Sequence, residues 1–190
     1  MRLIATDIDG IYIIEPEVYT DTRGYFYESF SEREFLKLTG IATHFVQDNE
    51  SRSRAGVVRG LHFQLPPHAQ SKLVRVIEGE ILDVAVDLRR GSPTFGRSVS
   101  TVLSGKNHRQ LFIPRGFAHG FVALDEAIVA YKCDDYYAPE CEGAIRWDDP
   151  TLAIDWGINS LEAIVSAKDA TAPMLDECSA LFDYNTDYYA

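Results

Sequence analysis

Cysteine, basic residues and long apolar segments are all scarce in this chain. Its three cysteines, Cys133, Cys141 and Cys178, are irregularly spaced and form no Cys-x-x-Cys pair, so a disulfide framework is not expected. No apolar run approaches the roughly 18 residues that span a bilayer, and residues 1–10 lack the basic and apolar regions of a secretory leader. These absences predict a reduced, cytoplasmic protein.

The shortage of basic residues excludes one class of partner. The sequence has 18 Lys and Arg residues against 29 Asp and Glu residues, which gives a formal net charge of −11. Nucleic acids and anionic membrane surfaces require a basic face, so we expect neither as a partner. A small anionic ligand, held by a few local arginines and lysines, is still compatible with this composition.

Short strand-like runs make up most of the sequence. With 190 residues, 46% of them hydrophobic, the chain is long enough for one domain with a single core, residues 1–190. Runs of β-branched and aromatic residues recur between turn residues, and this spacing is typical of an all-β sandwich or barrel. Glu78-Gly79-Glu80 predicts a tight hairpin, because glycine can take the positive φ of such turns. The predicted strands are residues 10–14, 25–29, 45–51, 57–64, 72–78, 81–88, 97–103, 110–113, 116–124 and 128–134.

Helices are few in the same pattern. Ser31 and Glu34 form a capping box that begins a helix, and Gly40 can end it. A second short helix is predicted near residues 175–181. The acidic, tyrosine-rich residues 183–190 predict a flexible tail.

One base and one cation stand out on two consecutive predicted strands. His62 is the only side chain in residues 56–64 that can exchange a proton near neutral pH, and Lys72 is spaced to begin a returning strand beside it. A base next to a fixed cation is what enolate chemistry requires, because the cation meets the developing O⁻. A lone histidine on a strand is more often a packing residue, but Arg59, Gln64 and Lys72 on one apolar wall favour the catalytic interpretation.

A second block, Pro114–Phe121, places a histidine on the strand that follows a proline–glycine turn. Two such blocks in this order indicate a cupin-type barrel. From Asp21 to Asp169 the sequence resembles the dTDP-4-dehydrorhamnose 3,5-epimerase family. The motifs that carry the resemblance are Arg23-Gly24-Tyr25-Phe26-Tyr27-Glu28, Gln47-Asp48-Asn49, Arg59-Gly60-Leu61-His62, Gln70-Ser71-Lys72-Leu73-Val74, Ser92-Pro93-Thr94-Phe95-Gly96, Pro114–Phe121, Tyr131-Lys132, Trp147-Asp148-Asp149-Pro150 and Ser166-Ala167-Lys168-Asp169.

The resemblance implies a cupin-type jelly-roll β-barrel with one or two short peripheral helices, which acts as a homodimer without a cofactor. It implies an isomerase that converts dTDP-4-dehydro-6-deoxy-D-glucose to dTDP-4-dehydro-L-rhamnose by epimerisation at carbons 3 and 5. The sequence leaves open an epimerase that acts only at carbon 3 in another deoxysugar pathway. A non-catalytic sugar-nucleotide-binding cupin is a further alternative, although such a module would not need a base, an acid and an enolate-stabilising lysine together.

Four positions match the family's catalytic set. The resemblance makes His62 the base and Asp169 the carboxylate that fixes its tautomer. Lys72 is assigned to the enolate oxygen. Tyr131 is assigned to return the proton from the opposite face of the sugar, since a single base returning its own proton would regenerate the starting stereocentre. The alternatives for Asp169 and Tyr131 are a solvated loop residue and a packing residue.

Further positions match segments of the family that bind the nucleotide and the sugar. Arg23, Arg59 and Lys168 can engage the diphosphate, and Tyr137 is the candidate to stack on thymine. Some of the N-terminal positions are expected to cross to the pocket of the partner subunit. The complete set is Arg23, Phe26, Glu28, Gln47, Asp48, Asn49, Arg59, Gln64, His119, Tyr137, Glu142 and Lys168.

Arg59 and His62 raise a problem of strand geometry. Alternation places Gly60, His62 and Gln64 on one face of their strand and Arg59 and Leu61 on the other. The family nevertheless has both the arginine and the histidine in the pocket. A β-bulge or a local twist at Gly60 would reconcile the two, because glycine tolerates the extra residue and bulges re-aim side chains near active sites.

His119 suggests a metal site that the rest of the sequence does not support. Metal-binding cupins offer a His-x-His pair in their first motif and a third histidine at the position of His119. The first motif here is His62-Phe63-Gln64, so the ligand set is incomplete and no metal is expected. The resemblance assigns His119 to substrate binding, and packing beside Phe117 and Phe121 is the alternative.

Overall fold

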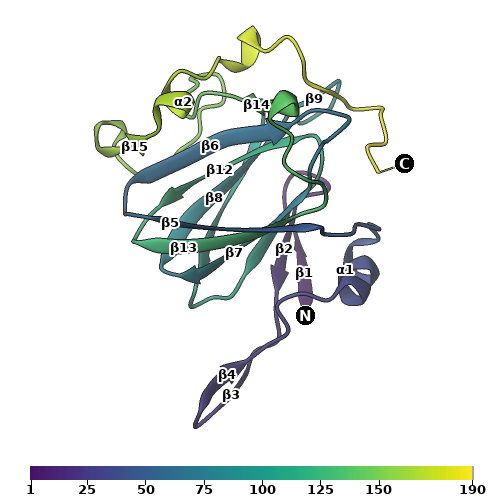
Figure 1. Ribbon diagram of the computed structural model, residues 1–190, viewed down its shortest axis with the longest axis vertical. Coiled ribbons are helices and arrows are strands. Elements are labelled where there is room, and N and C mark those ends of the chain that lie inside the picture. Colours follow the sequence, from purple (N-terminus) through teal and green to yellow (C-terminus); the bar gives the residue numbers. More distant parts are fainter. Residues whose placement is uncertain (190) are drawn as a thin grey trace.

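Two mainly antiparallel sheets, stacked face to face, form the body of the protein (Figure 1). The computed structural model describes residues 1–189. The first sheet has the strand order β1 (Arg2–Ala5), β2 (Tyr12–Glu15), β11 (Gln110–Ile113), β7 (Lys72–Glu78), β13 (Ala127–Cys133) and β5 (Gln47–Ser53). The second has the order β10 (Ser98–Ser104), β8 (Glu80–Asp87), β12 (Phe117–Ala123), β6 (Val57–Gln64) and β14 (Glu142–Ala144), with β15 (Ile164–Val165) parallel to β6. This arrangement confirms the predicted all-β jelly roll.

The remaining elements are short and peripheral. Two pairs of strands lie outside the main sheets: β3 (Tyr19–Asp21) with β4 (Gly24–Phe26), and β9 (Arg89–Arg90) with β16 (Phe182–Asp183). The helical segments are α1 (Glu32–Thr39), α2 (Ala167–Ala170) and the 3₁₀ turns η1 (Pro139–Cys141), η2 (Ser160–Glu162) and η3 (Leu175–Glu177). The helix predicted near residues 175–181 is therefore a single 3₁₀ turn, and the second α-helix is α2. No helix within residues 1–189 is long and apolar enough to cross a membrane.

Strand alternation gives the second sheet an apolar core on each face. On the face toward the first sheet, Ala85 and Phe121 pack with Val74 and Val129 of the opposite sheet. On the other face, side chains of β6, β8 and β12 are covered by the chain that follows β14, through residues such as Trp156. Because the last quarter of the chain, after β14, covers this sheet, its loops can reach the edge of β6.

Helix α1 covers the outer face of the first sheet and begins and ends as the sequence predicts. The Ser31 hydroxyl accepts a hydrogen bond from the Glu34 N–H (3.4 Å), and Gly40, at φ +73°, donates its N–H to the carbonyl of Leu36. Phe35 is 2% exposed and packs edge-on against Phe112 at 4.9 Å between ring centroids. Truncating such a buried ring to alanine costs about 3–5 kcal/mol of stability.

The turn at Gly79 carries the chain from one sheet to the other. Gly79 has φ +78°, and a Cβ there would lie 2.0 Å from the carbonyl oxygen of Glu126, so only glycine fits. The strands that it joins, β7 and β8, belong to different sheets and do not pair. The tight turn is as predicted, but the hairpin prediction is wrong. For the same reason Lys72 on β7 faces His62 on β6 across the interior and does not lie beside it on a paired strand.

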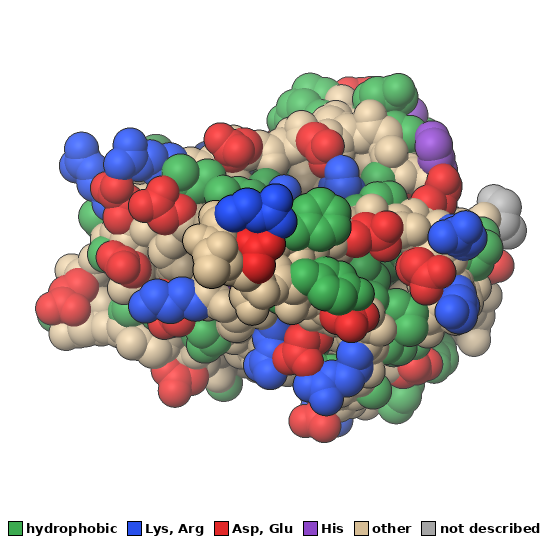
Figure 2. Space-filling view, turned by 90° about the horizontal axis from the view of Figure 1, so that it is seen from below, with side chains coloured by type: hydrophobic (Ala, Val, Ile, Leu, Met, Phe, Trp, Pro, Cys, Tyr) green, Lys and Arg blue, Asp and Glu red, His purple; other side chains and the backbone are tan. Residues whose placement is uncertain are grey.

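The β3–β4 hairpin projects away from the two sheets (Figure 1). Its aromatic side chains Tyr19, Tyr25 and Phe26 are all more than half exposed. Seen from the end of the molecule that carries the hairpin, acidic and basic side chains are interspersed over the surface (Figure 2). Large apolar side chains on a projecting arm of this kind are typical of a surface that contacts another chain.

Candidate active site

An extra residue in β6 turns Arg59 and His62 into the same cavity. Between these two residues, β6 has one more residue than the stretch of β12 with which it pairs. Gly60 has φ +118°, and a Cβ there would lie 2.5 Å from the Cα of Gly120. Leu61 packs in the outer core, whereas Arg59 and His62 line the cavity. The β-bulge predicted at Gly60 is confirmed.

Asp169 holds His62 from a segment far away in the sequence. Its Oδ1 lies 2.6 Å from Nε2 of His62, and its side chain is 5% exposed against 31% for His62. The Ser166 hydroxyl caps α2 by accepting a hydrogen bond from the Asp169 N–H (3.1 Å), and the carboxylate also accepts a hydrogen bond from the N–H of Gly60 (3.4 Å). The carboxylate is therefore fixed at the edge of β6.

The environment of His62 favours a neutral imidazole. Burial lowers the pKa of His62 below its ordinary value, although the hydrogen bond to Asp169 opposes this change. A carboxylate at Nε2 assigns the ring proton to that nitrogen, which leaves Nδ1 as the basic atom. The ring can accept a proton at neutral pH, and Asp169 would stabilise the imidazolium that results.

Lys72 and Tyr131 lie on the sheet opposite His62. Lys72 begins β7, and Tyr131 is two residues before the end of the neighbouring strand β13. Burial lowers the pKa of Lys72, against the influence of Cys133, Asp83 and Glu142, and burial raises the pKa of Tyr131. Tyr131 is thus protonated at neutral pH and can donate a proton from the wall opposite His62.

Two further cations lie around the cavity. Arg59 donates from Nε to the hydroxyl of Ser53 (3.0 Å) and from its terminal nitrogen to the carbonyl of Arg52 (3.3 Å). These hydrogen bonds fix the guanidinium of Arg59 and leave its other N–H groups free to bind an anion. Lys168 forms an ion pair with Glu142 at 2.5 Å.

A cavity of about 440 Å³ collects all four predicted catalytic residues. It offers a neutral base on one wall, and a cation and a protonated phenol on the other. This arrangement can remove a proton from an acidic carbon, stabilise the anion and return a proton from the opposite side. The lining residues are Ser51, Val57, Val58, Arg59, His62, Lys72, His119, Phe121, Tyr131, Ile164, Val165, Ser166, Lys168 and Asp169.

Comparison with known proteins identifies the family. The profile of the dTDP-4-dehydrorhamnose 3,5-epimerase family matches residues 5–177. The chain belongs to this family. The dTDP-4-dehydrorhamnose 3,5-epimerase of Methanothermobacter thermautotrophicus is 56% identical over 170 residues, which cover 88% of this chain and 91% of that protein.

Solved structures agree with this assignment. A dTDP-6-deoxy-D-glucose-3,5-epimerase from Legionella pneumophila, RmlC, crystallised with dTDP-4-keto-L-rhamnose, superposes with a TM-score of 0.93 at 52% identity and covers 97% of this chain and 99% of that one. ChmJ, a 3'-monoepimerase from Streptomyces bikiniensis in complex with dTDP-quinovose, has a TM-score of 0.83 at 32% identity, covering 90% of this chain and 86% of that one. The cupin jelly roll is thus shared with epimerases of both single and double action.

A second cavity of about 300 Å³ adjoins the first and shares His62, Lys72 and Tyr131 with it. Its other walls include predicted nucleotide-binding positions of this epimerase family, namely Gln47, Asn49, Gln64, Tyr137 and Glu142. The hydroxyl of Tyr137 donates to Glu142 (2.9 Å), which is the same carboxylate that pairs with Lys168. The structure therefore brings these predicted residues together around the catalytic group.

Gln64 lines this second cavity, and its amide group is bonded to the backbone. Its Oε1 accepts the N–H of Ala138 (2.8 Å), and its Nε2 donates to the carbonyls of His68 (2.7 Å) and Tyr136 (3.2 Å). With its amide group occupied in this way, Gln64 holds the loop that carries Tyr137. The alternation of a strand predicts that a side chain faces inward, but it does not predict which backbone groups will form hydrogen bonds with that side chain.

The structure does not bring Asp48 to the catalytic cavity. Strand β5 alternates, so Gln47 and Asn49 face the interior and Asp48 faces the other side, where it pairs with Lys132 at 2.9 Å. Three more predicted positions, Arg23, Phe26 and Glu28, lie on or just after the projecting hairpin and line neither cavity of their own chain.

His119 lies in the cavity wall as one half of a buried histidine–aspartate pair. Its Nε2 is 2.7 Å from Oδ1 of Asp83, and the two side chains are 8% and 0% exposed. Oδ2 of Asp83 is buried without a hydrogen-bond partner in residues 1–189. Asp83 was not among the predicted site residues, although a carboxylate inside the apolar run Ile81–Val86 was the available signal. Within residues 1–189, no group of three or more His, Cys, Asp or Glu side chains is placed to hold a metal ion.

Proposed function

We propose that this protein converts dTDP-4-dehydro-6-deoxy-D-glucose to dTDP-4-dehydro-L-rhamnose by epimerisation at carbons 3 and 5, a step of dTDP-L-rhamnose synthesis. The observation that carries the proposal is the position of His62, held by Asp169 at 2.6 Å, on the wall opposite Lys72 and Tyr131. Membership of the 3,5-epimerase family supports the substrate.

Each epimerisation proceeds through an enolate. His62 removes the proton from the carbon next to the C4 ketone, the C–H electron pair forms a C=C bond to C4, and the π pair of the carbonyl moves onto the ketone oxygen. The ammonium of Lys72 stabilises that oxygen. Tyr131 then delivers its proton to the other face of the carbon, the carbonyl re-forms, and solvent resets the protonation of both residues. Because the C4 ketone acidifies carbons 3 and 5 alike, no cofactor is required.

The remaining matched residues bind the nucleotide part of the substrate in this proposal. Arg59 and Lys168 engage the diphosphate, and Lys168 exchanges its contact with Glu142 for the ligand. Tyr137, which is 54% exposed beside the second cavity, offers its ring face to thymine. We assign His119 to the sugar, and its position on the wall that it shares with His62 supports this role.

The number of inverted carbons is settled by counting exchanged positions. Incubation with dTDP-4-dehydro-6-deoxy-D-glucose in deuterated water, followed by NMR of the product, should show deuterium at both carbon 3 and carbon 5 with inverted configuration. Deuterium at carbon 3 alone would make the protein a mono-epimerase, as ChmJ is described to be. Binding of the nucleotide sugar with no exchange at either carbon would indicate a binding protein.

We also propose a cytoplasmic homodimer in which the hairpin completes the neighbouring pocket. Arg23, Phe26 and Glu28 lie on or beside an exposed arm and line neither of the two cavities that contain His62 in their own chain. The three cysteines are free, which suits a reducing compartment.

Mixing inactive subunits tests this arrangement. Arg23→Ala and His62→Ala subunits should regain activity when mixed, because one pocket of each heterodimer then has both residues. His62→Ala mixed with Lys72→Ala is the matched control, since both residues belong to one chain's pocket and no intact pocket can form. Absence of recovery in subunits shown to exchange would contradict the shared pocket.

A further inference from the structure

The last residues of the chain form a strap across one end of the barrel. We use this name for residues 182–189. Phe182 pairs with Arg89 through β16 and β9, and its ring contacts Phe63 of β6 at 6.0 Å between centroids. Tyr188 packs edge-on against Phe182 at 5.3 Å, and its hydroxyl accepts the N–H of Asp183 (2.7 Å). The strap therefore has its own anchor on the outer core.

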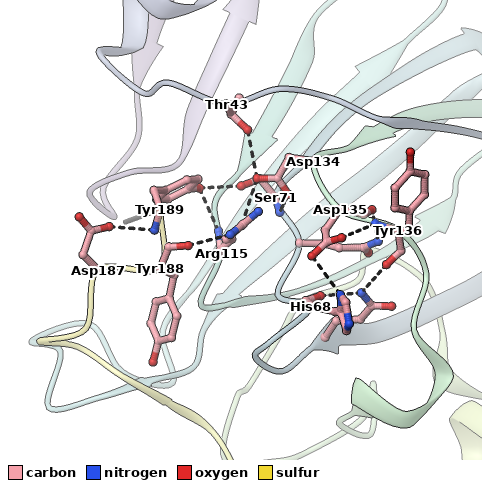
Figure 3. A network of polar contacts seen from close by, with 12 residues as sticks. Thr43, His68, Ser71, Arg115, Asp134, Asp135, Tyr136, Asp187, Tyr188 and Tyr189 are labelled. Carbon is pink, nitrogen blue, oxygen red and sulfur yellow. Dashed lines mark hydrogen bonds and ion pairs between the residues drawn. The ribbon is translucent and has the colours of Figure 1, made fainter.

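From this anchor, Tyr189 reaches the beginning of β7 (Figure 3). Its hydroxyl lies 2.6 Å from the hydroxyl of Ser71 and accepts a hydrogen bond from the backbone N–H of Arg115 (3.2 Å). Arg115 in turn donates from its guanidinium to the carbonyl of Tyr188 (2.7 Å) and lies over the ring of Tyr189 at 5.3 Å. Ser71 is fully buried, so its hydroxyl depends on Tyr189 for this hydrogen bond.

Asp134 ties the same cluster to β13 (Figure 3). Its carboxylate accepts hydrogen bonds from the Ser71 N–H (2.6 Å), the Arg115 guanidinium (3.1 Å) and the Thr43 hydroxyl (3.0 Å). The side chain of Asp134 is 2% exposed. A buried carboxylate with three donors holds its neighbours in one geometry, because losing any donor leaves charge uncompensated.

This cluster lies one residue away from the catalytic wall. Ser71 directly precedes Lys72, and Asp134 directly follows Cys133, which pairs with Lys72 in the ladder of β7 and β13. Tyr131 lies two residues before Cys133 on β13. The strap thus fixes the end of the two strands that present both the cation and the acid.

We propose that Tyr189 is a positioning residue that sets the place of the Lys72 ammonium through Ser71. The inference rests on the proposed function, since the role of Lys72 belongs to it. Misplacing a catalytic group by about 1 Å can cost about 10²-fold in rate, and one lost hydrogen bond shifts the strand end by less than that. We therefore expect a loss of about 10-fold in kcat when the Tyr189 hydroxyl is removed.

The substrate KM should change little in the same variant. The residues proposed to bind the nucleotide, such as Arg59, Tyr137 and Glu142, are not bonded to the strap. A positioning role therefore predicts a fall in kcat at a nearly constant KM, because the enolate interaction is made chiefly in the transition state. A role in stability alone predicts a lower melting temperature with kcat unchanged well below that temperature.

The experiment compares Tyr189→Phe with Tyr184→Phe and Ser71→Ala in the full chain. Tyr184 lies in the same strap, and the guanidinium of Arg89 lies over its ring, 5.2 Å from the ring centroid. The hydroxyl of Tyr184 has no hydrogen-bond partner in residues 1–189. We expect Tyr189→Phe and Ser71→Ala to lose similar factors in kcat, their double variant to lose no more, and Tyr184→Phe to match the wild type. Unchanged kcat in Tyr189→Phe, or an equal loss in Tyr184→Phe, would overturn the proposal.

A second comparison separates this inference from the proposed function. In a Lys72→Ala background, Tyr189→Phe should cause no further loss of deuterium exchange, because the group that it positions is gone. A further 10-fold loss there would show that the strap does not act through Lys72. Wild-type protein that exchanges no proton of the sugar would instead refute the proposed function, a result that the wild-type control reveals before any variant is compared.

Discussion

Two His–Asp pairs face the same cavity from neighbouring strands, and they differ in access. His62 and His119 are directly opposite each other on β6 and β12, and each has a carboxylate oxygen within 2.7 Å of Nε2. The side chain of His62 is 31% exposed, whereas that of His119 is 8% exposed. The same pair of side chains is thus accessible to a ligand at His62 and buried in the cavity wall at His119.

The difference lies in where each carboxylate comes from. Asp169 arrives from the loop and short helix after β15, so its pair lies at the margin of the sheet where a ligand can approach. Asp83 comes from the adjacent strand β8 and is fully buried. The buried carboxylate of Asp83 raises the pKa of Lys72 and so opposes the effect of burial. The pair that includes the loop residue Asp169 is open to the cavity, so its histidine can exchange a proton with substrate.

The largest expected effect is the loss of the accessible histidine. His62→Ala should abolish deuterium uptake at carbons 3 and 5, a loss of about 10²–10⁴-fold, because no other base reaches the C–H. His119→Ala should retain measurable exchange at both carbons with a raised KM. NMR of substrate and product in deuterated water measures both. Comparable loss of exchange in the two variants would remove the distinction between the pairs.

Tyr131→Phe should separate proton removal from inversion. The intact His62–Asp169 pair can still form the enolate and reprotonate it on the same face, so substrate protons should wash out while little inverted product forms. The loss of product formation should be about 10²–10⁴-fold. Normal epimerisation by Tyr131→Phe would show that another group donates the proton.

The two aspartates should differ by about one order of magnitude. Asp169→Asn removes the carboxylate that fixes the tautomer of His62 and should lower kcat by about 10²-fold or more. Asp83→Asn keeps the wall packed and leaves His62 intact, so about 10-fold is expected, in line with one charged hydrogen bond. Steady-state kinetics at one pH compares them, and a greater loss in Asp83→Asn would reverse the assignment of roles.

The smallest expected effect is on the pH profile of kcat/KM. His62 must be neutral, and Asp169 opposes the fall of its pKa, so Asp169→Asn should move the acid limb to lower pH. Lys72 must be charged, and Asp83 opposes the fall of its pKa, so Asp83→Asn should move the alkaline limb to lower pH.

Asp148→Asn is the control for this profile, because Asp148 pairs with Arg146 at the surface and should move neither limb. Movement of the same limb by Asp169→Asn and Asp83→Asn would show that the two pairs are not separate.

The two pairs also show what the sequence could and could not predict. Strand patterns predicted β6, β7 and β11 to the residue, since alternation and turn residues are local signals. His62 and Lys72 could be chosen from their residue types alone. Asp169 could not, because its contact depends on how the chain after β14 folds back over β6, and only the family resemblance named it. Asp83 required knowing that a buried carboxylate within a strand must have a partner.

The pairing of strands was the other limit. The turn at Gly79 has the sequence of a hairpin, yet whether two strands pair or enter different sheets depends on packing far from the turn. Asp48 lies outside the two cavities for a related reason, since alternate residues of β5 face opposite sides although the motif Gln47-Asp48-Asn49 was predicted as one unit.

The close approach of Gly60 to Gly120 has a consequence for saturation mutagenesis of this fold. A side chain at position 60 would collide with the Gly120 backbone, and one at position 120 would come within 2.8 Å of the Arg59 carbonyl oxygen. Both positions would score as intolerant as a catalytic residue, although neither has a side chain to contribute. A map of fitness alone would therefore enlarge the apparent catalytic centre by two residues that have no side chain to take part in the reaction.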